Sequence, residues 1–279
     1  MVMAYAYRDV GFQTLFEQPK VASMDYFIYF SDYLYREYSR NATDMSPTEY
    51  QNIYIYNNDE EAILSDYPID LGLVRQYFDV TDNPAEADFA LCIIGEPTLN
   101  LGYDPAEAGR GENGYIPVSL QYNDYTTVNA RKQSIAGGDP LESFTNRTYY
   151  GKTIKTRNRD DLQMILDTKQ AMGSKPVITV VELSKPVILS ELEPSSDAIL
   201  LSFGVQNQAL LDIISGKCEP SGLLPMQLPA NMKTVELNQE DVPHDVECLR
   251  DADNNIYDFA FGLNWKGVIH DWRTQKYKQ

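Results

Sequence analysis

Three uninterrupted apolar runs constrain the fold of this chain more than any other feature. The runs are Asp88–Ile94, Val177–Val181 and Ala198–Phe203, and Gly95 and Gly204 close the first and the third. None of them alternates apolar with polar residues, as a strand with one face in water does. Strands buried on both faces are typical of a parallel sheet that is covered by helices. The sequence therefore predicts such a sheet with helices on each side.

Helical patterns alternate with these runs along the chain. Helices are predicted over Asp70–Phe78, Arg159–Met172 and Gln208–Ser215. Asp70 can cap the first helix, and Gly173 directly follows the second, as helix ends prefer. Alternation of strands and helices is typical of the α/β class. We therefore predict an α/β fold: a three-layer sandwich whose mostly parallel, flavodoxin-like sheet is flanked by helices.

The N-terminal part has a different, aromatic character. Ten of the 20 tyrosines lie in the first sixty residues. Within Met24–Tyr38, Tyr26, Phe30 and Tyr33 recur at helical spacing, and further apolar residues occupy a second face. A helix with several apolar faces is covered on more than one side. We predict a core or domain-docking helix here, with a platform for sugar stacking as the alternative.

These patterns divide the chain into two parts. Residues 41–50, with Ser46-Pro47, are predicted to form a linker. A short strand is predicted at Ile53–Tyr56, after which strands and helices alternate. The predicted organisation is an aromatic helical segment with its linker over residues 1–50, followed by the α/β sandwich over residues 51–279.

Charge and composition exclude several classes of partner. Asp and Glu number 41 against 23 Lys and Arg, which gives a net charge of −18. Such a surface repels phosphate backbones, so neither nucleic acid nor an anionic membrane surface is an expected partner. No apolar run approaches the roughly 18 residues that a membrane span needs. The start, Met1–Asp9, lacks the regions of a secretory signal, which favours the cytoplasm for the chain as given.

Residue types also argue against metals and cofactors. The chain has two histidines and three widely spaced cysteines, without a Cys-x-x-Cys pair. Cys92 lies in an apolar run and is predicted to be a buried small hydrophobe. Glycine-rich phosphate-binding fingerprints are absent. We therefore expect no metal and no cofactor.

Two loops follow predicted strands at the edge where open α/β sheets bind ligands. The first is the start of a long insert, Glu96–Arg157, and it combines glycines and prolines with four acids up to Glu112. Loops of this length are usually functional or disordered, and carboxylates accept hydrogen bonds or, when desolvated, donate a proton. A solvated acidic loop is the alternative. The second loop leads into a helix, where Gln206 and Asn207 can contact a neutral polar ligand or a neighbouring domain; capping of the helix by Asn207 is the alternative.

Motifs in the C-terminal half resemble a known family. They are Asp197–Gly204, Ala209–Gly216, the Pro-Ser-Gly-Leu-Leu-Pro element within Glu219–Pro229, and Tyr257–Trp265 with its Phe-Gly-Leu. In this order and spacing they resemble the C-terminal α/β sandwich domain of family 3 glycoside hydrolases, the β-glucosidase and β-xylosidase group. The resemblance covers roughly residues 70–270.

The resemblance implies an enzyme of two domains. In that family a (β/α)₈ barrel bears the nucleophilic Asp in a Ser-Asp-Trp-like motif, and the sandwich lends the general acid/base from a loop. Neither Trp265 nor Trp272 is preceded by Ser-Asp, and a barrel of about 250 residues does not fit beside the sandwich. The chain is thus expected to be the second half of such an enzyme and to be inactive alone. A barrel, in the parent enzyme or in trans, and a β-linked gluco- or xylo-oligosaccharide are the expected partners.

The resemblance implies the chemistry, and loop position and residue type supply the candidate site residues. Acid/base catalysis needs a carboxyl group beside the leaving oxygen and a second one about 5–5.5 Å away that attacks the sugar. Candidate residues from the two loops have three roles: acid/base (Glu112 first, Glu107 second), hydroxyl binding (Asp104, Arg110, Gln206, Asn207) and ring stacking (Tyr103, Tyr115).

Two other functions stay open. A sandwich without its barrel can serve as a non-catalytic carbohydrate-binding or protein-interaction module, with the aromatic helix folded back on its own sheet. If that helix instead docks onto a barrel, its rings are exposed in the isolated chain and favour a homodimer. A flavodoxin-like cofactor domain is the more remote alternative.

Overall fold

The computed structural model describes residues 68–81, 83–99, 104–132, 148–239, 242 and 244–276, and the backbone of two short strands at 2–5 and 20–22. The predicted aromatic helix in residues 24–38 and the predicted strand at 53–56 lie outside the described residues. The proposed boundary near residue 50 therefore remains a prediction.

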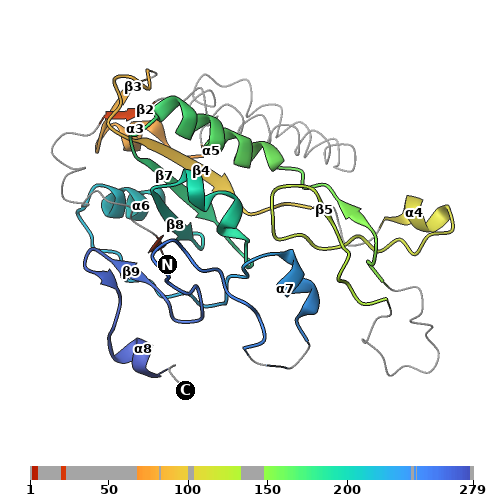
Figure 1. Cartoon of the computed structure of the whole chain (residues 1–279). Helices are drawn as coiled ribbons and strands as arrows, with labels where there is room; N and C mark the ends of the chain where they lie inside the picture. Colours follow the sequence, from red (N-terminus) through yellow and green to blue (C-terminus); the bar gives the residue numbers. More distant parts are fainter. Residues whose placement is uncertain are drawn as a thin grey trace, which may run out of the picture.

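A parallel three-stranded sheet forms the centre of the described fold (Figure 1). Its strands are β4 (Ala90–Gly95), β7 (Val177–Glu182) and β8 (Ala198–Ser202), and β7 lies in the middle. The register pairs Ile93 with Val180 and Val180 with Leu200. Every residue of the three strands is buried except Gly95 and Glu182 at two carboxyl ends. The predicted parallel core is confirmed.

Antiparallel strands extend this sheet beyond β8, which the sequence analysis did not predict. They are β1 (Val2–Tyr5), β9 (Leu263–Asn264) and β10 (Gly267–Val268), and the sheet order is β10-β9-β1-β8-β7-β4. Two-residue strands are too short for a periodic pattern to show. Two further pairs lie outside this sheet: β2 (Lys20–Ala22) runs parallel to β3 (Asp79–Thr81), and β5 (Tyr125–Thr126) runs antiparallel to β6 (Thr153–Ile154).

Helices cover both faces of the parallel strands (Figure 1). On one face, Cys92 and Ile94 of β4 pack in a core with α5 (Arg159–Met172). On the other face, Leu91 and Ile93 pack with α3 (Leu71–Val74) and α6 (Asn207–Ile214). Successive residues of a strand point to opposite faces, so each face receives every second apolar side chain. The α/β sandwich and the buried Cys92 are both confirmed.

Shorter helical segments lie outside these layers. They are α4 (Pro105–Gly109), η4 (Leu189–Glu191), η5 (Glu193–Ser195), α7 (Met232–Leu237) and α8 (Trp272–Lys276).

Two of the three helices that cover the sheet, α3 and α5, have the cap or the terminal glycine that the sequence predicts. The Asp70 carboxylate accepts a hydrogen bond from the Gly72 backbone N–H at 2.8 Å and caps α3. The helix α5 ends at Gly173, whose φ of 62° lies in the region that favours glycine. Helix α6 has Gln206 at its N-cap, without a side-chain cap, and Asn207 is already helical. The prediction that Asn207 caps this helix is therefore wrong.

Candidate functional site

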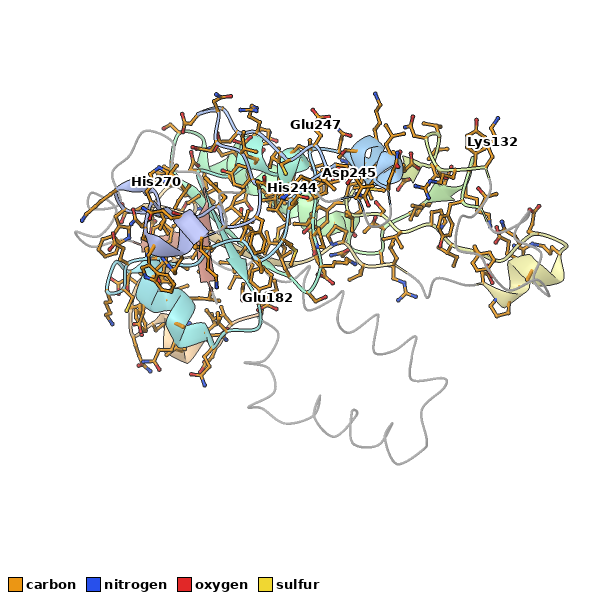
Figure 2. All side chains as sticks on the ribbon, turned by 90° about the horizontal axis from the view of Figure 1, so that it is seen from below. Lys132, Glu182, His244, Asp245, Glu247 and His270 are labelled. Carbon is orange, nitrogen blue, oxygen red and sulfur yellow. The ribbon has the colours of Figure 1, made fainter. Side chains whose placement is uncertain are left out.

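The long insert forms an arm that projects from the carboxyl ends of the parallel strands (Figure 1). We define the arm as residues 96–157, of which 96–99, 104–132 and 148–157 are described. The β5–β6 pair forms its middle, and α4 lies at its far end, away from the sheet. Figure 2 shows the same arrangement from below: Lys132 lies on the arm, far from Glu182 at the carboxyl end of β7.

Glu191 of η4 fixes the middle of the arm to the sandwich. Its carboxylate accepts hydrogen bonds from the Tyr122 backbone N–H at 2.6 Å and from the Asn123 side-chain amide at 2.8 Å. The buried Tyr122 hydroxyl donates to the Gly95 carbonyl at 2.7 Å. Hydrogen bonds to a charged group are about twice as strong as neutral ones. The arm is therefore anchored by polar contacts at this point.

A second carboxylate, from α7, holds the arm on another side. Glu236 Oε2 accepts from the Tyr125 hydroxyl at 2.6 Å and from the Asn129 backbone N–H at 2.9 Å. Burial of the phenol, together with the hydrogen bond to Glu236, raises the pKa of Tyr125 to about 12. Tyr125 thus stays protonated at neutral pH and keeps donating to Glu236.

Asn158 joins the two ends of the arm beside β4. Its Oδ1 accepts from the Thr98 backbone N–H at 2.8 Å, and its Nδ2 donates to the Glu96 carbonyl at 3.0 Å and to the Asp161 carboxylate at 2.8 Å. Asn158 and Asp161 are 2% and 3% exposed. Burial raises the pKa of Asp161 to about 7, and the hydrogen bonds from Asn158 and Gly95 oppose the shift.

Glu96, the first acid of the arm, is engaged in a turn. Its carboxylate accepts from the Ser184 backbone N–H at 2.6 Å and hydroxyl at 2.8 Å, and from the Lys185 backbone N–H at 3.1 Å. The Lys185 ammonium lies 3.6 Å away. Glu96 therefore links the ends of β4 and β7 and has little capacity for other roles.

The far end of the arm is a glycine-rich turn built on α4. Asp104 caps α4 by accepting from the Ala106 backbone N–H at 2.8 Å, and its own N–H donates to the Gly114 carbonyl at 2.7 Å. Gly111 and Gly114 have φ angles of 92° and 74°, which L-residues with side chains rarely adopt. The glycines are thus needed for the turn that carries Glu107 and Glu112.

Lys152 holds this turn against the rest of the arm. Its Nζ donates to Glu107 Oε2 at 2.7 Å, to the Tyr115 carbonyl at 2.7 Å and to the Asn113 side-chain oxygen. The Lys152 and Glu107 side chains are 18% and 22% exposed, so the pair is partly shielded from water. Sequence reasoning missed Lys152 because it lies 45 residues from Glu107 in the chain. Asn158 and Asp161 were missed for a related reason: they stand at the start of a helix, where polar residues are ordinary.

The remaining predicted site residues occupy two separate places. Glu112 and Arg110 are exposed on the turn, and within the described part of the chain no hydrogen bond or ion pair is recorded for the Glu112 carboxylate. The Tyr115 ring meets that of Tyr149 edge-on at 6.5 Å, and Tyr103 lies outside the described residues. Gln206 and Asn207 belong to α6, and no recorded hydrogen bond among the described residues joins them to the turn.

Other kinds of site find no support in the described residues. His244 and His270 lie well apart (Figure 2), so no site uses both. Among the residues described, no group of three or more His, Cys, Asp or Glu side chains is placed to hold a metal ion. The same part of the chain has no helix both long and apolar enough to cross a membrane.

Comparison with known proteins gives consistent matches. Residues 35–265 match the family described as the glycosyl hydrolase family 3 C-terminal domain. β-Glucosidase C of Emericella nidulans is 33% identical over 241 residues, which cover 74% of this chain and 37% of that protein. The periplasmic β-glucosidase/β-xylosidase of Dickeya chrysanthemi is 26% identical over 120 residues, or 43% of this chain and 17% of that protein. The chain thus spans only a minor part of the relatives that it matches.

Solved structures of β-glucosidases are also similar. The enzyme of Chaetomella raphigera matches with 18% identity and a TM-score of 0.40, over 71% of this chain and 26% of that one. The enzyme of Listeria innocua in complex with isofagomine matches with 16% identity and a TM-score of 0.37, over 70% and 26% of the two chains.

Proposed function

This chain belongs to the glycosyl hydrolase family 3 C-terminal domain family, and we propose that it forms one wall of the sugar pocket of a β-glucosidase-like enzyme. In this proposal its arm supplies the general acid/base. The nucleophile would come from a (β/α)₈ barrel domain outside this chain. The observation that carries the proposal is the position of the acid-bearing turn: Lys152 holds it against the rest of the arm, and it lies at the end away from the sheet, where a neighbouring domain could cover it.

Glu112 is the better candidate for the acid/base. A general acid must carry a proton when the glycosidic oxygen departs. The Glu107 carboxylate is already paired with the Lys152 ammonium at 2.7 Å and is engaged within the arm. Among the described residues no cation lies against the exposed Glu112 carboxylate, so this side chain is open to a covering domain and its substrate. In this proposal Glu107 anchors the turn and Glu112 acts on the sugar.

The substrate would be a β-linked gluco- or xylo-oligosaccharide. Relatives of this chain carry the names β-glucosidase and β-glucosidase/β-xylosidase. Asp104 and Arg110 on the same turn would bind sugar hydroxyls, and Tyr115 would stack on the ring with Tyr103. Gln206 and Asn207 lie on α6 and would contact the neighbouring domain or a more distant part of the substrate.

The test is a Glu112→Gln substitution in the enzyme that contains both domains. The variant should hydrolyse aryl glycosides about 10²–10⁴-fold more slowly, because the proton donor and the base of the second step are lost. Added azide should restore part of the turnover and give a glycosyl azide, since azide needs no general base. Full activity in this variant, or none of the azide product, would contradict the role of Glu112.

Two comparisons sharpen this experiment. Glu86→Gln removes an exposed carboxylate at the amino end of β4 and should leave turnover unchanged. The isolated chain should not hydrolyse p-nitrophenyl α- or β-glycosides, because only one of the two carboxyls is present. Hydrolysis by the isolated chain would place both carboxyls here. If adding a barrel domain in trans produces no turnover, a non-catalytic binding module becomes the better interpretation.

A further inference from the structure

The two ends of the arm meet in a small buried cluster that the proposed chemistry does not use. Its members are Asn158, Asp161, Thr98 and the backbone of Gly95 and Glu96. The cluster lies where β4 ends and α5 begins, directly under the arm.

Asn158 uses both sides of its amide in this cluster. The oxygen accepts from the Thr98 backbone N–H at 2.8 Å and from the Thr98 hydroxyl at 3.1 Å, so it holds the outgoing strand of the arm. The amide nitrogen donates to the Glu96 carbonyl at 3.0 Å and to Asp161 at 2.8 Å. Next to it, the Arg157 backbone N–H donates to the Thr98 carbonyl at 3.0 Å. A single side chain thus joins residues that are 60 positions apart.

Asp161 in turn fixes the orientation of the Asn158 amide. Only a carboxylate or another acceptor can face the Asn158 NH₂ group, and this forces the Asn158 oxygen toward Thr98. Burying a carboxyl group at 3% exposure is costly unless it is hydrogen-bonded, and the Asn158 amide supplies this hydrogen bond to Asp161.

We propose that Asn158 and Asp161 are positioning residues that lock the two ends of the arm together and so set the orientation of its acid-bearing turn. The lock itself follows from the contacts above, and its importance for catalysis rests on the function proposed for the arm. Neither side chain would touch the sugar; both would act through the backbone of residues 95–98 and 157.

Asn158→Asp tests the lock with little change in shape. The new carboxylate faces that of Asp161 where an N–H donated at 2.8 Å, and two carboxyls this close share a single proton. The pKa of Asp161 is already about 7 and the second carboxylate raises it further, so both groups are ionised and repel only well above pH 8. At about pH 5 the shared proton replaces the lost donor. Among the described residues, the titratable groups that interact electrostatically with Asp161 are Asp160 on the same helix and Tyr122 from the arm.

The readout is hydrogen exchange in the full chain, expressed as protection of the Thr98 and Arg157 amides. In Asn158→Asp this protection should fall about 10–100-fold at about pH 10, the size expected when a buried donor or acceptor loses its partner, and recover near pH 5. Asp161→Asn should lower the same protection at both pH values, because an NH₂ group replaces one of the two acceptor oxygens of Asp161 and no proton can be gained in its place.

Asn83→Asp is the matched control. Asn83 also donates to a carboxylate, Glu86 at 2.9 Å, but this exposed pair lies before β4, at the end opposite the arm. It should leave the protection of Thr98 and Arg157 unchanged. The proposal is overturned if the amides of Thr98 and Arg157 in Asn158→Asp keep their protection at about pH 10, if the loss is the same at pH 5, or if it spreads equally to the amides of β7.

Turnover separates this inference from the proposed function. In the enzyme with both domains, Asn158→Asp should lose activity as the pH rises well above 8 and regain it toward pH 5, beyond the change in the unmodified enzyme. Glu112→Gln should be slow across the same range. A loosened arm with unchanged turnover would show that the lock exists but does not position a catalytic group, and would overturn the catalytic part of the proposal.

Discussion

The parallel sheet and the arm are held together by opposite means. The three central strands bury nearly all of their residues between two helix layers, and many apolar side chains share the stabilisation. The arm is fixed by a few polar side chains that each make several contacts, among them Lys152, Glu191 and Glu236. We therefore expect the sheet to unfold cooperatively, whereas the arm can lose its attachments one at a time.

This difference suits the roles proposed for the two regions. Close packing resists displacement, so the sheet can act as a rigid platform. Hydrogen-bonded attachments keep a projecting segment in place without a core of its own, and they can be lost locally while the platform remains folded. Substitutions in each region can break or sharpen this contrast.

The largest effect is expected in the core. Phe89→Ala removes a fully buried ring that packs edge-on against Phe78 at 5.4 Å. Substitutions of this kind cost about 3–5 kcal/mol in the free energy of unfolding. Denaturant unfolding should show a single shifted transition, with sheet and arm lost together. Leu166→Ala, at an exposed position of α5, should stay within about 1 kcal/mol of the unmodified chain; a comparable loss there would contradict the burial described.

A pH-dependent effect of similar size is expected from Asp161. Its pKa is raised from 3.8 to about 7, so the folded chain binds this proton more tightly than the unfolded chain. Stability from this group is therefore greatest below about pH 4 and is lost as the pH rises to about 7, by roughly 4 kcal/mol in total.

Unfolding measured between pH 4 and 8 checks this sign. Asp161→Asn should flatten the fall in stability that accompanies rising pH, while Asp160→Asn, at the exposed neighbouring position, should preserve it. An unchanged slope in Asp161→Asn would mean that the carboxyl is already ionised in the folded chain at low pH.

The sheet could be predicted closely from the sequence because its signals are local. The helix predicted at Arg159–Met172 has these bounds in the structure, and the strand predicted at Val177–Val181 is one residue longer. Apolar runs and a following glycine determine such elements within a few residues of chain. The strands β9 and β10 escaped prediction because two residues carry no periodicity.

The sequence predicted the arm as a long functional insert, but it did not predict the side chains that attach the arm to the sandwich. Glu191 meets Tyr122 across 69 residues and Glu236 meets Asn129 across 107, and no local pattern connects such pairs. The acids of the turn could be identified by type and position, yet the distinction between them depends on Lys152. That lysine pairs with Glu107 and not with Glu112, which only the folded arm shows.

A moderate, local effect is expected from Lys152. Lys152→Met keeps the length of the side chain but leaves Glu107, Asn113 and the Tyr115 carbonyl without their donor. The cost of about 1–3 kcal/mol should be confined to the turn, seen as faster hydrogen exchange of the amides around α4 with little change in the midpoint of global unfolding. Lys132→Met, an exposed arm residue near the Tyr150 ring, should leave this exchange unchanged. Global destabilisation by Lys152→Met would show that arm and sheet unfold as one unit.

The smallest effect compares two glycines on the same turn. Gly111 has a φ of 92°, whereas Gly109 is helical, and a Cβ would meet no atom within 4 Å at either position. An added methyl group is therefore equally uncrowded at both positions, and only the backbone φ angle differs between them. Gly111→Ala should cost about 1 kcal/mol through strain, while Gly109→Ala should be neutral or stabilising by up to about 1 kcal/mol because it restricts the unfolded chain. Exchange of the arm amides should separate the two variants. Equal behaviour would show that the turn does not keep this backbone in solution, and the placement of Glu112 beside Glu107 would then lose its support.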